Sequence, residues 1–164
     1  MSTSKQKVFE NIEYEIERVG YALITINSKS THEPVFTYSV GLSSMGLPEL
    51  VFVRRPTSVV RRIIDTLIEM AKSGWTFDGH NTRIKAILEH DLALIKAQKT
   101  VSSDLMSVAV DYSNQSEKKY SISLDNVCVV CWPDGDGAFP GEEGYKRSID
   151  SNIVPFEKAI STLH

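Results

Sequence analysis

Long apolar runs are absent from the 164-residue chain. No hydrophobic stretch approaches the roughly 18–20 residues that a helix needs to span a bilayer, so we expect no membrane partner. The first residues, MSTSKQKVFENIEYE, become charged before the apolar core of a signal peptide could form. This pattern predicts a cytoplasmic protein.

Cysteine is scarce, and neither sign of charge dominates. Two cysteines do not build a disulfide framework, so reduced thiols are expected. Eighteen Lys and Arg residues stand against 21 Asp and Glu, which gives a net charge of −3. That balance provides no overall attraction for the phosphates of long nucleic acids, and we expect no partner of that class.

The composition is that of one globular domain over residues 1–164. Apolar residues make up 41% of the chain and charged residues 24%, which is ordinary for a soluble protein. A chain of this length buries about two thirds of the surface that its unfolded form exposes. No linker, repeat or low-complexity tract divides the sequence, which therefore predicts a single domain.

Helical and strand patterns alternate along this domain. Apolar spacing predicts helices over residues 4–19, 57–73, 102–114 (with Ser102 or Ser103 as N-cap) and 155–163. Alternating or β-branched runs predict strands over 21–27, 35–42, 49–53, 75–77, 82–88, 92–97 and 126–132, with 75–77 and 82–88 forming a hairpin around Asp78-Gly79. The order favours an α+β fold with a curved, mainly antiparallel sheet and helices packed on one face.

Cys128 and Cys131 have the C-x-x-C spacing of zinc knuckles and dithiol redox sites. The surrounding residues, NVCVVCW, predict a strand, in which positions three apart point to opposite faces. No second C-x-x-C or H-x-x-x-H completes a set of four ligands. We therefore interpret both cysteines as small buried apolar residues and expect neither a metal nor a cofactor.

The acidic turn that follows resembles the start of a calcium loop, because DGDG begins at Asp134. An EF-hand needs an oxygen ligand at position five, glycine at six and glutamate at twelve, and the chain has Ala138, Phe139 and Tyr145 there. Two interpretations remain, a solvated acidic turn and a looser divalent site. The second would use Asp134, Asp136, Glu142 and Glu143.

Four arginines bracket the start of the second predicted helix: Arg54, Arg55, Arg61 and Arg62. Basic groups at a helix N-terminus oppose the helix dipole by a few tenths to about 1 kcal/mol, so a bound anion would explain their position. The alternative is that these side chains lie in water beside Asp65 and Glu69.

Three segments are specific in combination: Phe36-Thr37-Tyr38-Ser39-Val40-Gly41-Leu42, Gly46-Leu47-Pro48-Glu49-Leu50-Val51, and Trp132-Pro133-Asp134 with Gly137 and Phe139-Pro140. Together they resemble the bacterial and phage family known as domain of unknown function 4262, over about residues 20–140. The resemblance implies a compact α+β domain without an established activity, and the family's distribution suggests a setting in phage–host defence or counter-defence. The chain departs from the family at Gly141, where a larger residue is common.

The polar and aromatic residues of these segments permit two interpretations. Glu49 and Asp134 either cap loops by binding backbone amides or converge on one pocket with Tyr38 and Trp132, whose rings could stack on a base. The leading hypothesis is a non-enzymatic protein that binds a nucleotide-like anionic small molecule or an acidic protein surface through its arginines.

Two other classes of function stay open. One is a hydrolase of phosphorylated or nucleotide substrates with Glu49, Asp134 or His80 as general base, which requires two such groups within reach of one concave site. The other is a pure interaction module, including a homodimer formed through the acidic first helix, which predicts an exposed apolar patch.

Overall fold

The computed structural model describes residues 4–27, 34–87, 90–97, 106–139 and 142–146. Their order is α1 (Ser4–Val19), β1 (Ala22–Asn27), β2 (Pro34–Val40), the 3-10 helix η1 (Leu42–Met45), β3 (Glu49–Val53), α2 (Thr57–Lys72), β4 (Thr82–Ile87), β5 (His90–Lys96), α4 (Ser107–Ser113) and β6 (Val127–Cys131). The predicted helix at 155–163 lies outside the described residues. Among the described helices, none combines the length and the apolar character needed to cross a membrane.

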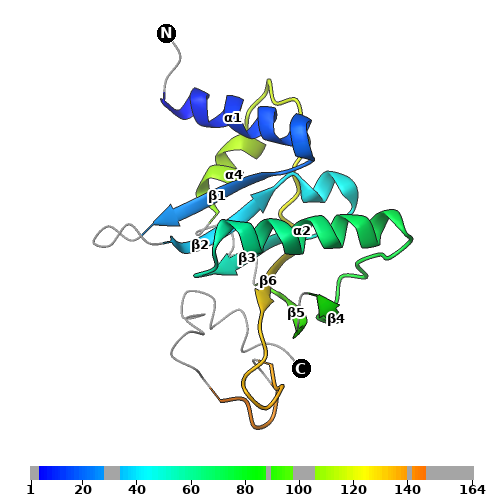
Figure 1. Cartoon of the computed structure of the whole chain (residues 1–164). Coiled ribbons are helices and arrows are strands. Elements are labelled where there is room, and N and C mark those ends of the chain that lie inside the picture. The colour runs from blue at the N-terminus through cyan, green and yellow to red at the C-terminus, as the bar shows by residue number, and fades with distance from the viewer. Residues whose placement is uncertain (1–3, 28–33, 88–89, 98–105, 140–141, 147–164) are drawn as a thin grey trace.

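One six-stranded sheet organises the domain, with strand order β1-β2-β3-β6-β5-β4 (Figure 1). Every neighbouring pair is antiparallel except β3 and β6, which run parallel with Glu49 opposite Val127 and Val51 opposite Val129. The predicted α+β class and the mainly antiparallel sheet are therefore confirmed.

Helices cover both faces of the sheet, which corrects the expectation that they pack on one face. Successive strand side chains point to opposite faces, and here both sets are apolar, as in the buried run of β6. One face packs against α1 and α4 through Ile12, Ile16 and Ala109, and the other packs against α2 through Ile63 and Leu67. A sheet with two apolar faces needs a helical layer on each, which the strand order alone did not reveal.

Two predicted elements differ from the structure. Residues 75–77 form no strand, because Trp75 and Phe77 pack as loop residues against the α2-side core, and the hairpin is instead formed by β4 and β5. The helix predicted from residue 102 begins at Ser107, with Met106 as its N-cap. Ser102 and Ser103 lie outside the described residues.

Candidate functional site

The parallel strands β3 and β6 divide the predicted site residues between two ends of the sheet. Glu49 begins β3 and lies opposite Val127, the first residue of β6. The last residue of β6, Cys131, is four positions after Val127. At a strand rise of about 3.3 Å per residue, these two residues are about 13 Å apart. Trp132 and Asp134 lie beyond Cys131, at the far end of the strand pair. Glu49 and Asp134 therefore do not share a pocket.

Glu49 is fully buried and accepts five hydrogen bonds. The backbone amides of Gly41, Leu42 and Ser43 donate to its carboxylate at 2.9, 3.1 and 3.1 Å. The hydroxyls of Ser39 and Ser43 donate at 2.8 and 2.9 Å. We call this set the Glu49 knot, and it fixes the turn between β2 and η1 onto the start of β3.

The knot also reaches the segment before β6. The amide of Ser123 donates to the Ser43 hydroxyl at 3.0 Å, and the amide of Glu49 itself donates to the carbonyl of Asn126 at 3.0 Å. Burial raises the pKa of Glu49, while the donors from Gly41, Ser39 and Ser43 act to lower it. With no exposed surface and its oxygens engaged, Glu49 has a structural role.

Gly41 is required at the centre of this knot. Its φ of 120° lies in the region that favours glycine. A Cβ there would lie 3.0 Å from Ile16 Cγ1 and 3.1 Å from the carbonyl oxygen of Gly20. The same glycine thus allows the amide to face Glu49 and α1 to approach β2.

Asp134 organises a second loop by the same chemistry, but at the surface. Its carboxylate accepts hydrogen bonds from the amides of Asp136, Ala138 and Lys146 at 2.9, 2.9 and 2.8 Å. These bonds, that from Lys146 first, lower the pKa of Asp134. The interpretation of Glu49 and Asp134 as residues that bind backbone amides is therefore confirmed.

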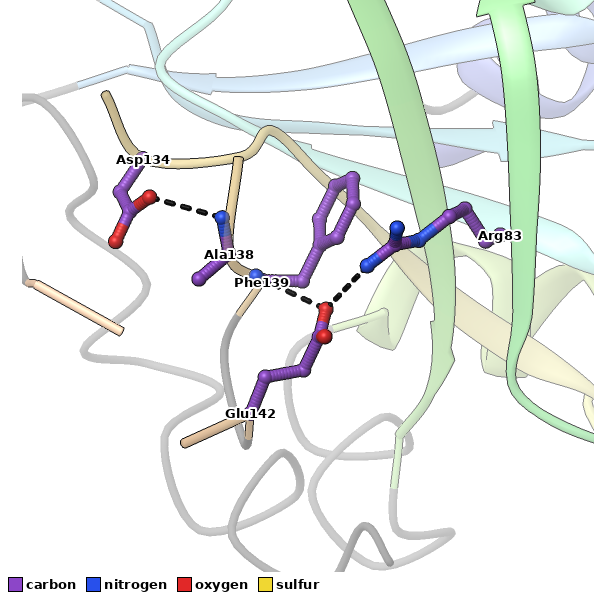
Figure 2. Close-up of polar contacts among 5 residues, drawn as sticks. All are labelled: Arg83, Asp134, Ala138, Phe139 and Glu142. Carbon is purple, nitrogen blue, oxygen red and sulfur yellow. Dashed lines mark hydrogen bonds and ion pairs between the residues drawn. The ribbon is translucent and has the colours of Figure 1, made fainter. Parts of the chain in front are cut away.

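Phe139 and Glu142 attach the Asp134 loop to the sheet (Figure 2). Phe139 is buried in the core on the α1 side, and its amide donates to Glu142 at 3.1 Å. Arg83 of β4 pairs with Glu142 at 2.7 Å and lies over the Phe139 ring at 4.8 Å. Glu142 is thus engaged by an arginine and an amide.

The proposed divalent site has little support in this geometry. Asp134 binds amides, Asp136 pairs with Lys146 at 3.4 Å, and Glu142 pairs with Arg83. Over the part of the chain that the structure describes, no group of three or more His, Cys, Asp or Glu residues is placed to hold a metal ion. The acidic turn is a loop cap.

Tyr38 cannot offer a stacking surface, because its side chain is fully buried in the core on the α1 side. Its hydroxyl lies beside the amides of Val108 and Ala109 without an aligned hydrogen bond. Burial raises the pKa of Tyr38 to about 12. The predicted pairing of Tyr38 and Trp132 around a base is therefore wrong, since Trp132 packs on the opposite face of the sheet.

The four arginines separate into distinct environments. The Arg55 guanidinium lies over the Trp132 ring, 3.8 Å from its centroid. Arg61 lies over Tyr21 at 5.8 Å, and the Tyr21 hydroxyl donates to Asp65 at 2.9 Å. Arg54 and Arg62 are exposed. The Arg61 side chain thus lies over Tyr21, the residue before β1. Arg55, through its contact with Trp132, lies at the carboxyl ends of β3 and β6.

We call residues 54–58, between β3 and the first turn of α2, the arginine turn. Arg54 has a φ of 52° and is the one non-glycine residue with positive φ in the described part of the chain. Such a conformation costs about 1–3 kcal/mol. Pro56 is the N-cap of α2, without a side-chain cap bond, and the first turn holds no acidic residue.

Cys128 and Cys131 lie on opposite faces of β6, as predicted. Cys128 belongs to the core beneath α2 and Cys131 to the core beneath α1 and α4. Burial raises the pKa of each thiol to about 12. Two protonated thiols pointing apart form neither a redox pair nor a metal site.

An open groove of about 180 Å³ lies between α1 and α4, away from the arginine turn. Three glutamates contribute to its walls, and one of them, Glu13, accepts hydrogen bonds from the Tyr112 hydroxyl at 2.9 Å and the Lys119 amide at 2.7 Å. This acidic lining disfavours anions. The lining residues are Gln6, Phe9, Glu10, Glu13, Tyr112, Gln115, Glu117 and Lys118.

Sequence reasoning missed the side-chain partners of Glu49 and of Glu142. Ser39 lies within the first signature segment and Ser43 directly follows it, and the Gly41-Leu42-Ser43-Ser44 run shortly before a strand-initiating glutamate was the available signal. The pairing of Arg83 with Glu142 had no such signal, because 59 residues separate the two.

A comparison with known proteins places these signature segments in a family. The model described as "Domain of unknown function (DUF4262)" matches residues 15–146, well over half of the chain. No curated protein and no solved structure matches. The matched range includes both the Glu49 knot and the Asp134 loop. The chain belongs to the family of domain of unknown function 4262.

Proposed function

We propose that the protein is a non-enzymatic binding protein that takes up a nucleotide-like anionic small molecule at the arginine turn. The observation that carries this proposal is the Arg55–Trp132 stack at 3.8 Å beside the start of α2. Arg55 and Trp132 meet because β3 and β6 are parallel neighbours, so their carboxyl ends are adjacent. Ligands in sheets with parallel strands commonly bind at such ends.

The start of α2 supplies the complementary polar groups. The amides of Val59 and Val60 donate to the Pro56 carbonyl, whereas no described acceptor faces the amides of Thr57 and Ser58. Backbone amides at a helix N-terminus favour anions through both hydrogen bonding and the helix dipole. A phosphate at Thr57 and Ser58 would also be attracted by the exposed Arg54.

The strained conformation of Arg54 supports a functional reason for this turn. A glycine or asparagine would adopt a φ of 52° at lower cost than arginine. Strained residues cluster at ligand sites, where binding compensates their cost. Position 54 therefore carries a positively charged arginine, although the stability of the fold alone would favour glycine or asparagine there.

The hydrolase alternative has less support from the geometry. Glu49 is buried, the oxygens of Asp134 accept three amides, and no hydrogen bond among the described residues joins either of them to His80. A general base must reach its substrate. A cytoplasmic role in sequestering an anionic signal during phage–host conflict would suit a binding protein of this kind.

The test uses the fluorescence of Trp132. The Trp75→Phe variant keeps Trp132 as its single tryptophan, and it is titrated with inorganic phosphate, pyrophosphate, AMP and cyclic AMP. We expect at least one nucleotide to change the emission saturably, and at a hundredfold excess over its Kd to stabilise the fold by about 2.7 kcal/mol.

Arg55→Ala, with the matched control Arg18→Ala, then locates the site. Arg18 pairs with Glu15 on α1, so its removal changes the net charge equally without touching the arginine turn. Binding should weaken at least tenfold in Arg55→Ala and stay unchanged in Arg18→Ala. Equal affinities in both variants, or no response to any probe, would contradict the proposal.

A further inference from the structure

The two edges of the sheet differ in a way that points to a partner. β4 forms one edge, and its exposed residues Arg83 and Lys85 place charge there. β1 forms the other edge, and its sequence ALITIN contains no charged residue, proline or glycine. Charges and prolines are the usual devices that keep an edge strand from pairing with another chain. β4 has such protection and β1 lacks it.

Within the part of the chain that the structure describes, the backbone of β1 is open to pairing along its outer side. β1 pairs with β2 alone, and no described residue hydrogen-bonds to its other edge. Alternate amides and carbonyls of an edge strand point outward, and they form a template for another strand. Helix α1 packs on the adjacent face of the sheet through Ile12 and Ile16.

We infer that β1 pairs antiparallel with β1 of a second copy of this chain, joining two sheets into one. A two-fold axis normal to the sheet places paired side chains on the same face. With Ile24 opposite its own copy, Ala22 lies opposite Ile26 and Leu23 opposite Thr25. Leu23, Ile24 and Ile26 are each partly exposed, and such pairing buries them further without bringing like charges together.

A second observation concerns exposed apolar side chains on α1 and near its junction with β1. The exposed large apolar side chains of the described residues are Val8, Tyr14, Val19 and Met45. Val8 and Val19 are eleven residues apart on α1, about three helical turns, and so lie on one side of the helix. Met45 lies near Gly20, which joins α1 to β1. We extend the inferred interface from the β1 edge to this side of α1.

Sedimentation analysis of the full chain and a matched pair of variants tests this inference. Thr25→Lys charges the β1 edge and removes one hydroxyl contact, to Thr37 at 3.1 Å. Thr82→Lys makes the same change on β4 and removes one hydroxyl bond, to the His80 carbonyl at 2.9 Å. At tens of micromolar, the wild type and Thr82→Lys should have twice the 18.3 kDa chain mass, and Thr25→Lys should have the single mass.

A wild type that is monomeric at every concentration would overturn the inference. So would a Thr25→Lys variant that stays dimeric, because the interface would then lie elsewhere. Circular dichroism checks that Thr25→Lys is folded. Amide exchange in wild-type β1 provides a second measurement: protection of its outward amides should increase with protein concentration, and protection independent of concentration would count against pairing.

Discussion

The Glu49 knot and the Asp134 loop use the same chemistry in opposite environments. Each is a carboxylate that binds backbone amides of a glycine-containing turn, at opposite ends of the β3–β6 pair. Burial raises the pKa of Glu49, whereas amide bonds lower that of Asp134. The buried carboxylate ties β2, β3 and η1 together, and the surface carboxylate shapes its own loop.

This difference explains what the two carboxylates of the signature segments do in this chain. A buried carboxylate is tolerated only when its hydrogen bonds are made, so Glu49 requires Ser39, Gly41 and Ser43 around it. The Asp134 loop depends on Phe139 in the core for its position and on Asp134 for its shape. The Glu49 knot and the Asp134 loop are thus architectural, whereas the local architecture does not explain the arginine turn and the Trp132 ring beneath Arg55.

The largest expected effect is that of Glu49→Gln. The amide nitrogen of glutamine turns a donor toward the amides or hydroxyls that now donate to Glu49, so the free energy of unfolding should fall by about 3–5 kcal/mol. Urea denaturation followed by circular dichroism measures it. A loss below about 1 kcal/mol would show that the knot contributes little net stability.

Gly41→Ala should be the next most damaging change. A methyl group there meets the Gly20 carbonyl oxygen and Ile16 in a backbone conformation that alanine disfavours, so we expect a loss of about 2–3 kcal/mol. The matched control is Gly46→Ala, where φ is 78° but no atom lies within 4 Å of the added Cβ. Its loss should be about 1 kcal/mol. Equal losses of stability in Gly41→Ala and Gly46→Ala would show that the contacts with Ile16 and Gly20 are not the cause of the Gly41→Ala effect.

Alkaline pH should destabilise the protein through its buried thiols and phenols. The pKa of each cysteine rises from 9.0 to about 12, and that of Tyr21, Tyr38 and Tyr112 from 10.0 to about 12. The unfolded chain therefore releases these protons first, and the stability they contribute, fully present below pH 9, is lost progressively up to about pH 12.

Urea titrations at pH 8, 9.5 and 11 measure this loss. In the same experiment, iodoacetamide should modify neither cysteine of the native protein at pH 8 and both after unfolding, because the thiolate is the reactive form. Rapid modification of the native protein would contradict the buried positions of the two thiols.

The smallest effect is expected for Asp134→Asn. An asparagine oxygen can still accept hydrogen bonds from the amides of Asp136 and Ala138, and only the bond from the Lys146 amide is lost, because an NH2 group cannot accept it. The thermal midpoint should therefore shift much less than in Glu49→Gln. An equal shift in the two variants would contradict the distinction between the fully buried Glu49 carboxylate and the partly exposed Asp134 carboxylate.

Much of the fold could be predicted from local patterns. The bounds of α1 and β3, and the burial of Cys128 and Cys131 on opposite faces of the sheet, follow from apolar periodicity. The placement of helices on both faces did not follow, because it depends on which strands become neighbours. The strand predicted at residues 75–77 was wrong for a related reason. Aromatic residues such as Trp75 and Phe77 can cover a core from a loop as readily as from a strand.

The candidate site was harder to predict, because its contacts join distant segments. The sequence left open whether Glu49 and Asp134 bind backbone amides or share a pocket, and it did not indicate that Glu49 is fully buried. It grouped Arg61 with Arg55, whereas Arg61 lies over Tyr21. The neighbours of a side chain depend on strand order and helix placement, and neither leaves a local signature.

Native-state hydrogen exchange of four amides tests the comparison most directly. The amides of Gly41 and Ser43 donate to buried Glu49, and those of Ala138 and Lys146 donate to Asp134 at the surface. The account predicts that Gly41 and Ser43 exchange only through large-scale unfolding, with protection near that of the β3 core, while Ala138 and Lys146 exchange through local opening. Similar protection at all four amides, or fast exchange at Gly41 and Ser43, would contradict it.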